Sequence, residues 1–407
     1  MRFTILTQYF PPEIGAPQAR LAELAQKMVE AGHSVTVLTA MPNYPTGKIY
    51  PGYGGLLRQE SSDGIKIIRT FIYPTQRASF ARRLANYFSF VVSASIFGSV
   101  LLKPPDYLMV ESPPLFLGFA GYWLSRLKST HLIFNVSDLW PESAVRLGML
   151  REDSLPYRLS AWLERFCYRR SWLITGQSKS ILENICGRFP DSATFHLSNG
   201  VDTGKFHPDR QTEESRGVLT GNSDRGTCIA LYAGLHGLAQ GLEQVIAVAH
   251  LLRSEDGLRF VLIGDGPEKL LLVQQAQRQH LTNVSLLDPR PSSDMPALVA
   301  SADLILVTLK TFIPGAVPSK LYEAMASARP VILVASGEAA DIVRKHQAGL
   351  VVEPGDITGF EKALRTLTAQ PELRRTLGEN GRRAAEQYFD RALIATRFIN
   401  FLEDYER

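Results

Sequence analysis

Residues 2–40 decide the fold class of the chain, and they read RFTILTQYFPPEIGAPQARLAELAQKMVEAGHSVTVLTA. Phe3–Thr7 is an apolar run that predicts a strand. Apolar residues then recur at helical spacing between Leu21 and Val29, and Gly32 is a typical helix stop. Val35–Leu38 predicts the next strand. This order of strand, helix and strand is typical of a parallel sheet covered by helices.

The same alternation continues along the chain, so the expected fold class is α/β. Further strands are predicted at 65–72, 107–110, 132–136 and 172–175, then at 229–232, 260–263, 284–287, 304–307, 331–334 and 350–352. The second series is apolar throughout, as in a sheet buried on both faces. We expect two Rossmann-like, doubly wound parallel-sheet domains that face a central cleft. Their expected bounds are 1–203 and 204–387, with a helix at about 388–407 that packs back on the first domain.

A polar, turn-rich stretch separates the two series of strands. It runs from Ser198 to about Gly226 and shows no apolar period. Gly, Pro, Asn, Asp and Ser clusters of this kind are typical of loops. We therefore place the domain linker in this stretch.

Length and composition exclude several classes of protein. A domain takes about 150 residues, so 407 residues predict at least two. With 45% apolar and 21% charged residues, the chain is neither disordered nor collagen-like. The net charge of +4 does not by itself indicate nucleic acid. The three cysteines form no CxxC pair, which indicates no disulfide framework, no zinc site and a reducing cytoplasm. The first residues are unlike a signal peptide, so no export is expected.

The most informative loop is Ile313–Ala326, which reads IPGAVPSKLYEAMA. It ends in a helix for which Ser319 is the expected N-cap. Free N–H groups and the dipole at a helix start attract phosphate, and Lys320 adds a full positive charge. A capping box would place its acid at Tyr322, so Glu323 stays available to the hydroxyl groups of a sugar. The alternative is an ordinary capped helix whose lysine and glutamate are solvated.

Two glycine turns follow other strands of the second series. Gly264–Glu268 follows the strand at 260–263, and Gly234–Gly241 follows the strand at 229–232. Neither turn is a GxGxxG fingerprint, so a dehydrogenase is not indicated. Each turn taken alone is also compatible with a purely structural role.

Six motifs spread over the chain carry a family resemblance. They are FPPEIG at 10–15, EAGHSV at 30–35, NGVD at 199–202, GDGP at 264–267, PSKLYE at 318–323 and GLVVEPGD at 349–356. With these motifs the chain resembles the family 4 glycosyltransferases, which have the two-domain GT-B fold. The resemblance implies an enzyme of O-antigen, capsule or exopolysaccharide assembly. It also implies that the second domain binds the nucleotide-sugar donor, that the first presents the acceptor, and that transfer retains the anomeric configuration.

The resemblance implies a metal-independent reaction. No two aspartates in the chain are separated by one residue, so the DxD motif that holds a metal against the donor diphosphate in other glycosyltransferases is missing. We therefore expect no metal and no other cofactor.

The family pattern implies a donor site around the 313–326 loop. Glu323 would hold the ribose as the second acid of an E-x7-E motif, while Lys320 and the helix start meet the diphosphate. The first acid of that motif falls at Gly315, so the N–H groups of Gly315–Val317 or another residue must orient the sugar. The expected donor-binding residues are Gly15, His236, Gly237, Gly264, Asp265, Gly266, Arg290, Gly315, Ala316, Val317, Ser319, Lys320, Leu321 and Glu323.

The diphosphate would meet less charge than is usual in the family. The Arg and Lys commonly found in the segment matching Gly234–Gly241 are absent, and His236 and Gln240 stand nearby instead. We therefore expect neutralisation by Lys320, by helix dipoles and by Arg290.

The first domain contributes three candidates at the carboxyl ends of its strands. Gly15 lies in the loop after the first strand, where a glycine allows close approach of the backbone to the donor. Asp138 follows the strand at 132–136, and it either accepts a hydrogen bond from the acceptor hydroxyl or caps the next helix. Glu111 is a further acceptor-side candidate. The expected catalytic residues are Lys320, Asp138 and Glu323.

A basic and apolar segment extends from Ala78 to Lys103. Arg77, Arg82 and Arg83 accompany a run of aromatic and aliphatic residues that begins at Tyr87. This composition suits an anionic membrane surface and a polyprenyl-diphosphate-linked acceptor. The apolar run of about 16 residues is below the roughly 20 needed to cross a bilayer. The alternative is a buried helix with solvated arginines.

Together these features predict a cytoplasmic glycosyltransferase associated with the inner face of the plasma membrane. It would move a sugar from a nucleotide sugar, with UDP favoured, to a lipid-linked saccharide, with no nucleic-acid partner. In such a retaining transfer the leaving diphosphate oxygen itself helps to take the acceptor proton. Two alternatives stay open: a nonhydrolysing UDP-sugar 2-epimerase and a catalytically silent nucleotide-sugar-binding protein.

Overall fold

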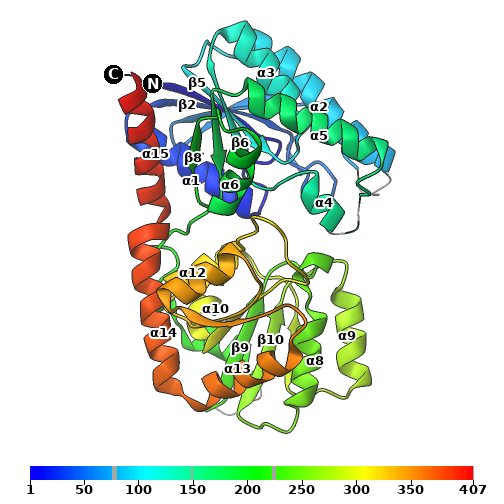
Figure 1. Cartoon of the computed structure of the whole chain (residues 1–407), viewed down its shortest axis with the longest axis vertical. Coiled ribbons are helices and arrows are strands. Elements are labelled where there is room, and N and C mark those ends of the chain that lie inside the picture. Colours follow the sequence, from blue (N-terminus) through cyan, green and yellow to red (C-terminus); the bar gives the residue numbers. More distant parts are fainter. Residues whose placement is uncertain (76–79, 147, 149, 222–225, 407) are drawn as a thin grey trace. The chain divides into compact units, whose positions relative to one another are not determined.

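The computed structural model describes residues 1–75, 80–146, 148, 150–221 and 226–406. The chain divides into two compact units. Unit 1 comprises Met1–Asn199 and Arg391–Arg407, and unit 2 comprises Gly200–Asp390. Each unit is a largely parallel sheet with helices on both faces, which confirms the predicted α/β class (Figure 1).

Eight strands form the sheet of unit 1. They are β1 (Arg2–Leu6), β2 (Ser34–Ala40), β3 (Leu57–Ser62), β4 (Ile65–Thr70), β5 (Tyr107–Ser112), β6 (His131–Val136), β7 (Leu173–Gly176) and β8 (Thr194–His196). Their order is β3-β4-β2-β1-β5-β6-β7-β8, and only β3 pairs antiparallel among them. Because β1 pairs with both β2 and β5, the direction of strand addition reverses at this point.

Two layers of helices bury alternate side chains of the unit 1 strands. Phe3 and Ile5 of β1 belong to one core cluster and Leu6 to the other. The first layer consists of α1 (Ala16–Glu30) and α15 (Arg391–Glu406). The second consists of α2 (Phe80–Leu101), α3 (Leu117–Lys128), α5 (Leu155–Arg170) and α6 (Lys179–Arg188). A short helix, α4 (Glu142–Arg146), follows β6.

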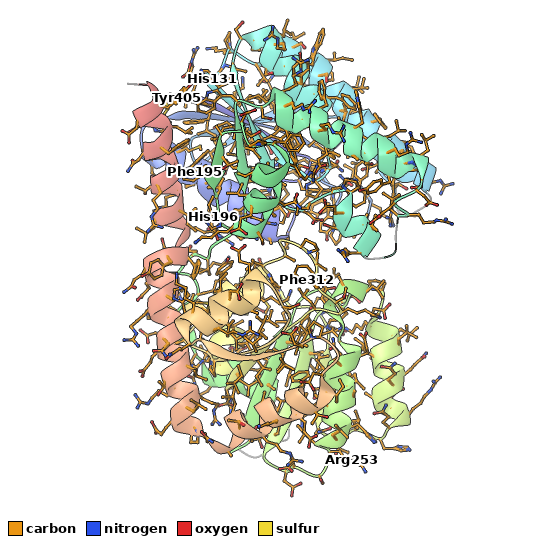
Figure 2. The ribbon with its side chains drawn as sticks, viewed as in Figure 1. His131, Phe195, His196, Arg253, Phe312 and Tyr405 are labelled. Atoms are coloured by element: carbon orange, nitrogen blue, oxygen red, sulfur yellow. The ribbon has the colours of Figure 1, made fainter. Side chains whose placement is uncertain are left out.

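The final helix, α15, completes the core of unit 1. It lies along α1, and Phe398 packs 5.2 Å from the Phe195 ring. Near its end, Tyr405 lies 4.5 Å from Trp172 and 6.2 Å from His131, measured between ring centres (Figure 2). The last helix therefore belongs to the unit that contains the first strand.

Six parallel strands form the sheet of unit 2. They are β9 (Cys228–Ala233), β10 (Leu258–Ile263), β11 (Val284–Leu287), β12 (Leu304–Thr308), β13 (Val331–Val334) and β14 (Gly349–Val352). Their order is β11-β10-β9-β12-β13-β14. All the strands that the sequence predicts in this unit are present.

Two helical layers also enclose the unit 2 sheet. One consists of α7 (Glu213–Thr220), α10 (Met295–Ser301), α11 (Ser319–Ala326), α12 (Glu338–His346) and α14 (Pro371–Ala384). The other consists of α8 (Glu243–Leu251), α9 (Lys269–Arg278) and α13 (Ile357–Ala369). Short turns complete the unit: η1 (Pro208–Arg210), η2 (Leu238–Gln240) and the π-helical η3 (Ala385–Phe389).

The predicted linker is wrong in one respect, because α7 lies inside it. The Thr212 hydroxyl caps this helix by accepting the Ser215 N–H at 3.1 Å. Leu219 is buried against the sheet, and Arg216 pairs with Asp303 at 2.7 Å. Only one buried leucine anchors the helix, so its sequence shows no apolar period.

Candidate functional site

Four loops and one helix start lie at the carboxyl edge of the unit 2 sheet. They are the loops after β9, β10, β11 and β12 and the first turn of α11. Because β9 pairs with β10 on one side and with β12 on the other, the direction of strand addition reverses between β9 and β12. Open α/β sheets bind ligands at such a switch point. The segments that the sequence singles out in this unit therefore share the edge where a ligand is expected.

Lys320 reaches from α11 to the loop after β9. Its Nζ atom lies 5.4 Å from the centre of the Tyr232 ring, and its stem covers Gly234 so closely that a Cβ there would lie 2.7 Å from Nζ. Within the described residues, no hydrogen bond or ion pair engages the ammonium group. Burial lowers the pKa of Lys320, while the Glu323 carboxylate opposes that shift. Lys320 is thus a half-buried cation without a bonded anion.

Glycines allow the loops after β9 and β10 to lie against each other. A Cβ at Gly264 would collide with Gly234 O, and one at Gly266 would collide with His236 O. The two residues also have φ values of 151° and 155°, which disfavour other residues. The His236 N–H donates to Asp265 O at 2.8 Å and closes the same contact. The glycines of the GDGP turn therefore allow the β9 and β10 loops to pack closely against each other.

His236 lies inside this contact with its ring fully enclosed. Its exposed fraction is 0%, and neither Nδ1 nor Nε2 has a hydrogen-bond partner among the residues that the structure describes. The Nε2 atom lies 3.1 Å from the position of a Cβ on Gly264. Desolvation lowers the pKa of His236 to about 4, with further lowering by Lys269 and Lys320 and an opposing effect of Asp265. The imidazole is therefore neutral near pH 7.

Gln240 adds a third unsatisfied atom to the same loop. Its Oε1 is buried, has no hydrogen-bond partner in the described part of the chain, and lies 2.6 Å from the position of a Cβ on Gly237. A buried polar atom without a hydrogen bond costs about 1–3 kcal/mol. Such unsatisfied groups within a few residues of each other, next to an unpaired lysine, are typical of a site built to receive a ligand.

The start of α11 differs from the prediction. The helix begins at Ser319 with Pro318 as its N-cap, and the proline side chain makes no capping hydrogen bond. Pro318 has the extended conformation that an N-cap needs, so the serine hydroxyl is not required there. The Leu321 N–H donates to Pro318 O at 3.0 Å, and the Ala316 N–H donates to Ile313 O at 3.1 Å. These two amides, expected to bind the donor, are already bonded.

The other predicted donor residues lie at different distances from the switch point. Glu323 is half-buried one turn into α11, and no hydrogen bond engages its carboxylate within the described part of the chain. Gly315 is buried with φ 76°, and Val317 packs into the core. Arg290 is exposed after β11, the outermost strand, which places it two strand spacings from β9, or roughly 10 Å. Asp265 is exposed, and its carboxylate accepts the N–H of the next residue.

In unit 1, the loop after β1 is fixed by a buried carboxylate. Glu13 Oε1 accepts the N–H groups of Asn43 and Tyr44, each at 2.8 Å. Gly15 follows as the N-cap of α1 with φ 170°, an extended conformation open to any residue. A Cβ at Gly15 would meet only the flexible side chain of Gln18. The geometry thus gives no conformational reason for glycine at this position.

Glu111 has a structural role rather than the acceptor contact predicted from sequence. It is buried at the end of β5, where its Oε1 accepts a hydrogen bond from Arg20 Nη2 at 2.6 Å and another from the Ser137 hydroxyl. Arg20 in turn donates to Gln177 at 2.9 Å and to Asn199. This network ties α1 to the ends of β5, β6 and β7, so the carboxylate is not free to bind a substrate.

Asp138 lies after β6 at the same edge of the unit 1 sheet. The Ser143 hydroxyl donates to Asp138 Oδ1, and burial raises the pKa of the carboxyl group. It therefore holds the turn before α4 and is also an enclosed carboxylate whose affinity for a proton is raised. Both alternatives left open by the sequence are compatible with this geometry.

The predicted basic segment forms much of α2. Arg77 lies outside the described residues, and Arg82 and Arg83 are exposed. Over Arg82–Leu101, α2 is long and apolar enough to span a membrane by length and composition alone, with a third of that window buried in the unit. The helix is thus longer than the apolar run in the sequence. The core helix of a soluble protein can have the same length and composition. The residues on the exposed face of α2 must therefore indicate whether it contacts a membrane.

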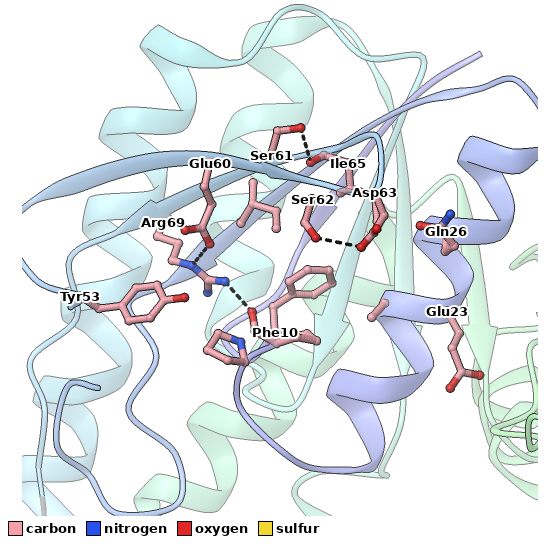
Figure 3. A pocket seen from close by; sticks show the side chains of 14 residues that line it. Phe10, Glu23, Gln26, Tyr53, Glu60, Ser61, Ser62, Asp63, Ile65 and Arg69 are labelled. Carbon is pink, nitrogen blue, oxygen red and sulfur yellow. Dashed lines mark hydrogen bonds and ion pairs between the residues drawn. The ribbon is translucent and has the colours of Figure 1, made fainter. Parts of the chain in front are cut away.

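A cavity of about 670 Å³ lies elsewhere in unit 1, between α1, β3 and β4 (Figure 3). Arg69 crosses its wall, pairs with Glu60 at 2.6 Å and donates to Pro11 O. None of the predicted site residues that the structure describes lines it. Since its arginine is already paired, the cavity offers no vacant charge for a diphosphate.

Comparison with known proteins identifies the family. A sequence profile described as "Glycosyl transferase 4-like domain" matches residues 15–200, and one described as "Glycosyl transferases group 1" matches residues 221–384. The chain is 24% identical over 412 residues to the putative colanic acid biosynthesis glycosyl transferase WcaI of Escherichia coli K12. This alignment covers 98% of this chain and 99% of WcaI. This chain belongs to the family 4 glycosyltransferases.

This glycosyltransferase shares its fold with solved sugar transferases. Sucrose-phosphate synthase of Thermosynechococcus elongatus superposes with a TM-score of 0.80 at 17% identity, over 99% of this chain and 98% of that one. HepE of Anabaena, solved with UDP and glucose, superposes with a TM-score of 0.69 at 18% identity. The superposition covers 99% of this chain and 100% of HepE. The predicted GT-B fold is confirmed, as is the prediction of a transferase enzyme.

Sequence reasoning about this glycosyltransferase missed Arg20, which organises the unit 1 edge, and Tyr232, whose ring lies next to Lys320. Gly234 was noted as the first residue of a glycine turn after a predicted strand, but its contact with Lys320 was not predicted. Among the described residues, no group of three or more His, Cys, Asp or Glu side chains is placed to hold a metal ion.

Proposed function

We propose that the enzyme transfers a sugar from a nucleotide sugar, held by unit 2, to a lipid-linked saccharide held by unit 1, in surface polysaccharide biosynthesis. The diphosphate would lie between the β9 loop and the start of α11, with the ribose on Glu323. UDP is the favoured nucleotide, and no metal is required. Relatives such as WcaI, named for colanic acid biosynthesis, support the pathway class. HepE, which has the same fold, was solved with UDP and glucose.

One observation carries the donor site: the unpaired Lys320 ammonium at the switch point of unit 2. An unpaired, half-buried lysine is costly, because its charge has lost water without gaining an anion. A diphosphate would supply that anion, and the open N–H groups at the start of α11 would add hydrogen bonds. Glu323, whose carboxylate is free of hydrogen bonds, would accept them from a ribose one turn further along the helix.

The proposed chemistry follows from this charge. As the bond between sugar and diphosphate breaks, negative charge grows on the leaving phosphate oxygen, and Lys320 stabilises it. In a retaining transfer the same oxygen takes the proton of the acceptor hydroxyl as the new glycosidic bond forms on the same face. No residue is then required as a covalent nucleophile. Asp138, with its raised pKa, is the unit 1 carboxylate that we assign to the acceptor hydroxyl.

Replacing Lys320 tests the donor site. Lys320→Ala should lower turnover by more than about 100-fold, as expected for loss of a charged group that stabilises the leaving diphosphate. The assay follows radiolabel from UDP-sugars into the organic phase of a membrane lipid extract. Lys310→Ala is the matched control, since Lys310 lies in the loop that leads from β12 to α11 but is exposed and paired with Glu243 at 3.1 Å.

The outcomes of this assay separate the alternatives. Equal loss in both lysine variants, or none in Lys320→Ala, would contradict the donor site. Binding of donor without any transfer by the wild type would indicate a silent binding protein. Conversion of the donor to its 2-epimer without acceptor would indicate an epimerase.

The proposal of a lipid-linked acceptor is based on the exposed apolar and basic residues of α2, α3 and α5. On α2, the stripe of Phe88, Val92, Ile96 and Val100 is exposed, with Val100 at 77%. Trp123 on α3 and Trp162 on α5 are exposed at 56% and 55%. Single exposed apolar residues are ordinary, but a stripe with two tryptophans beside it is typical of a membrane or protein contact.

Charge favours a membrane as the partner of this face. The three helices contain exposed arginines, namely Arg82, Arg83, Arg126, Arg158, Arg165, Arg169 and Arg170. Their one acidic residue, Glu164, is buried and paired with Arg188. A surface with cations around apolar side chains and no exposed acid fits an anionic bilayer. A lipid-diphosphate acceptor would be found at that surface.

A further inference from the structure

His236 is the unexplained residue of the donor site. A fully buried imidazole has a donor and an acceptor atom, and here both are unsatisfied. An apolar residue of similar volume would avoid that cost, which is of order 1–3 kcal/mol for each unsatisfied group. The polar atoms of the ring therefore add no hydrogen bond to the free enzyme, and a role in a ligand-bound state would explain why a histidine is placed here.

The backbone around His236 holds the ring in place. The His236 N–H donates to Asp265 O at 2.8 Å, and its carbonyl accepts the Glu268 N–H at 3.0 Å. At Gly264 and Gly266 the β10 loop lies so close to the β9 loop that a side chain at either position would collide with it. The His236 backbone is thus fixed between these two loops, next to the proposed diphosphate site.

Charged groups from every neighbouring loop and helix act on this ring. Lys320 on α11 and Lys269 on α9 disfavour its protonation, and Asp265 in the β10 loop favours it. Lys269 is itself paired with Asp288 at 2.6 Å, and the Tyr232 ring lies 5.9 Å away on β9. Without ligand, burial and the sum of these charges keep the imidazole neutral. Burial is the largest cause of this neutral state, and the two lysines add to it, Lys269 more than Lys320. Within the described residues, the charge of Lys320 has no bonded anion.

A diphosphate at this position would reverse the balance. It would add two negative charges next to Lys320, and in a partly buried site such charges act strongly through space. Lys320 would then be neutralised, and the imidazole would face net negative charge. Direct contact between His236 and the ligand is not needed for this effect.

On the basis of the proposed function, we propose that His236 takes up a proton when the donor binds, so that the site acquires a second cation, besides Lys320, together with the diphosphate. The balance is one proton from solvent, bound at an imidazole nitrogen, for each donor bound. The sequence lacks the Arg and Lys common in this loop of the family, and a ligand-induced histidinium supplies charge in their place. His236 is thereby a residue that positions and neutralises the diphosphate.

Isothermal titration with UDP-glucose tests the proton uptake. Because the diphosphate of UDP-glucose has no proton to exchange near neutral pH, any proton taken up enters the protein. Binding heats are measured at pH 6 in buffers with different ionisation enthalpies, and their slope gives the number of protons. The wild type should take up roughly one proton, and its Kd should rise about tenfold per pH unit between the free and the bound pKa of the histidine. His236→Gln should show neither effect.

A matched histidine and a second measurement make the test decisive. His250→Gln changes a histidine on α8 that contacts Arg253, and it should keep the uptake of the wild type. If His236→Gln does not fold, the nitrogen chemical shifts of the histidine rings in the wild type, with and without UDP-glucose, still report whether a neutral ring becomes charged.

Each result points to a different conclusion. Binding with a zero slope in the wild type, or an unchanged slope in His236→Gln, would overturn the proposal and leave the donor site standing. Failure of UDP-glucose to bind at all would reject the proposed UDP-sugar site itself, and the proton uptake with it.

Discussion

Gly234, Gly264 and Gly266 are the residues on which the carboxyl edge of the unit 2 sheet depends most directly. At each of them a Cβ would collide with another part of the site: the Lys320 stem, the Gly234 carbonyl or the His236 carbonyl. These contacts join the β9 loop to the β10 loop and to the first turn of α11. The glycines therefore fix the position of Lys320 and His236 rather than merely allowing the chain to turn.

Gly264→Ala should destabilise the protein by about 3 kcal/mol or more, because either the β9 or the β10 loop must move. Gly257→Ala is the matched control, since a Cβ there meets nothing within 4 Å, and it should change stability by less than about 0.5 kcal/mol. Urea denaturation followed by circular dichroism measures both. Equal stabilities of the two variants would show that the loops are not tightly packed.

Some of the candidate site residues could be identified from the sequence, and the contacts of others could not. Lys320 and Glu323 could be predicted because a helix start with a lysine and a free acid is a local pattern. The burial of Glu111 could not, because its partner Arg20 is 91 positions away. The unsatisfied ring of His236 depends on the β10 loop, so no local pattern could reveal it.

Among the helices and strands, α2 has an exposed apolar stripe whose proposed contact with a membrane can be tested by mutation. Ile96 lies in the middle of its exposed stripe, and burying an isoleucine in a bilayer interface contributes about 2–3 kcal/mol. Ile96→Glu should therefore weaken binding to anionic vesicles at least tenfold in a sedimentation assay at low salt. Leu270→Glu on α9 replaces an equally exposed residue of unit 2 and should have no effect. Wild-type protein that stays in the supernatant would rule out the membrane contact.

The elements also differ in how far they could be predicted. Strands such as β1, β9 and β12 are continuous apolar runs, because both faces of each sheet are covered. β3 and β8 were missed, the first because its exposed, polar residues lie at the sheet edge and the second because it has only three residues. The cap of α11 was misplaced by one residue, because proline supplies the required conformation without a hydrogen bond.

At the scale of the whole molecule, each of the four core clusters lies within one unit. Unit 2 also has its two ends side by side, since Val201 forms a bridge with Asp390 and Thr203 bonds to the same aspartate. A fragment of residues 200–390 should therefore fold by itself. If unit 2 alone holds the donor, the fragment should bind UDP within about tenfold of the full chain, a difference below 1.4 kcal/mol.

Calorimetry on the purified fragment measures this affinity. A folded fragment that does not bind UDP, beside a full chain that does, would show that unit 1 supplies part of the nucleotide site. An unfolded fragment would show that unit 2 depends on unit 1 for stability.

The return of α15 to unit 1 has a consequence for biosynthesis. Phe398 and Leu402 complete a core that Phe3 and Ile5 begin, so unit 2 is in effect an insertion between the two parts of unit 1. Because domains fold as units while the chain is made, unit 2 can mature on the ribosome while the earlier segment still waits for its closing helix. During that interval, nascent chains would expose apolar strands to chaperones until residues 391–406 emerge.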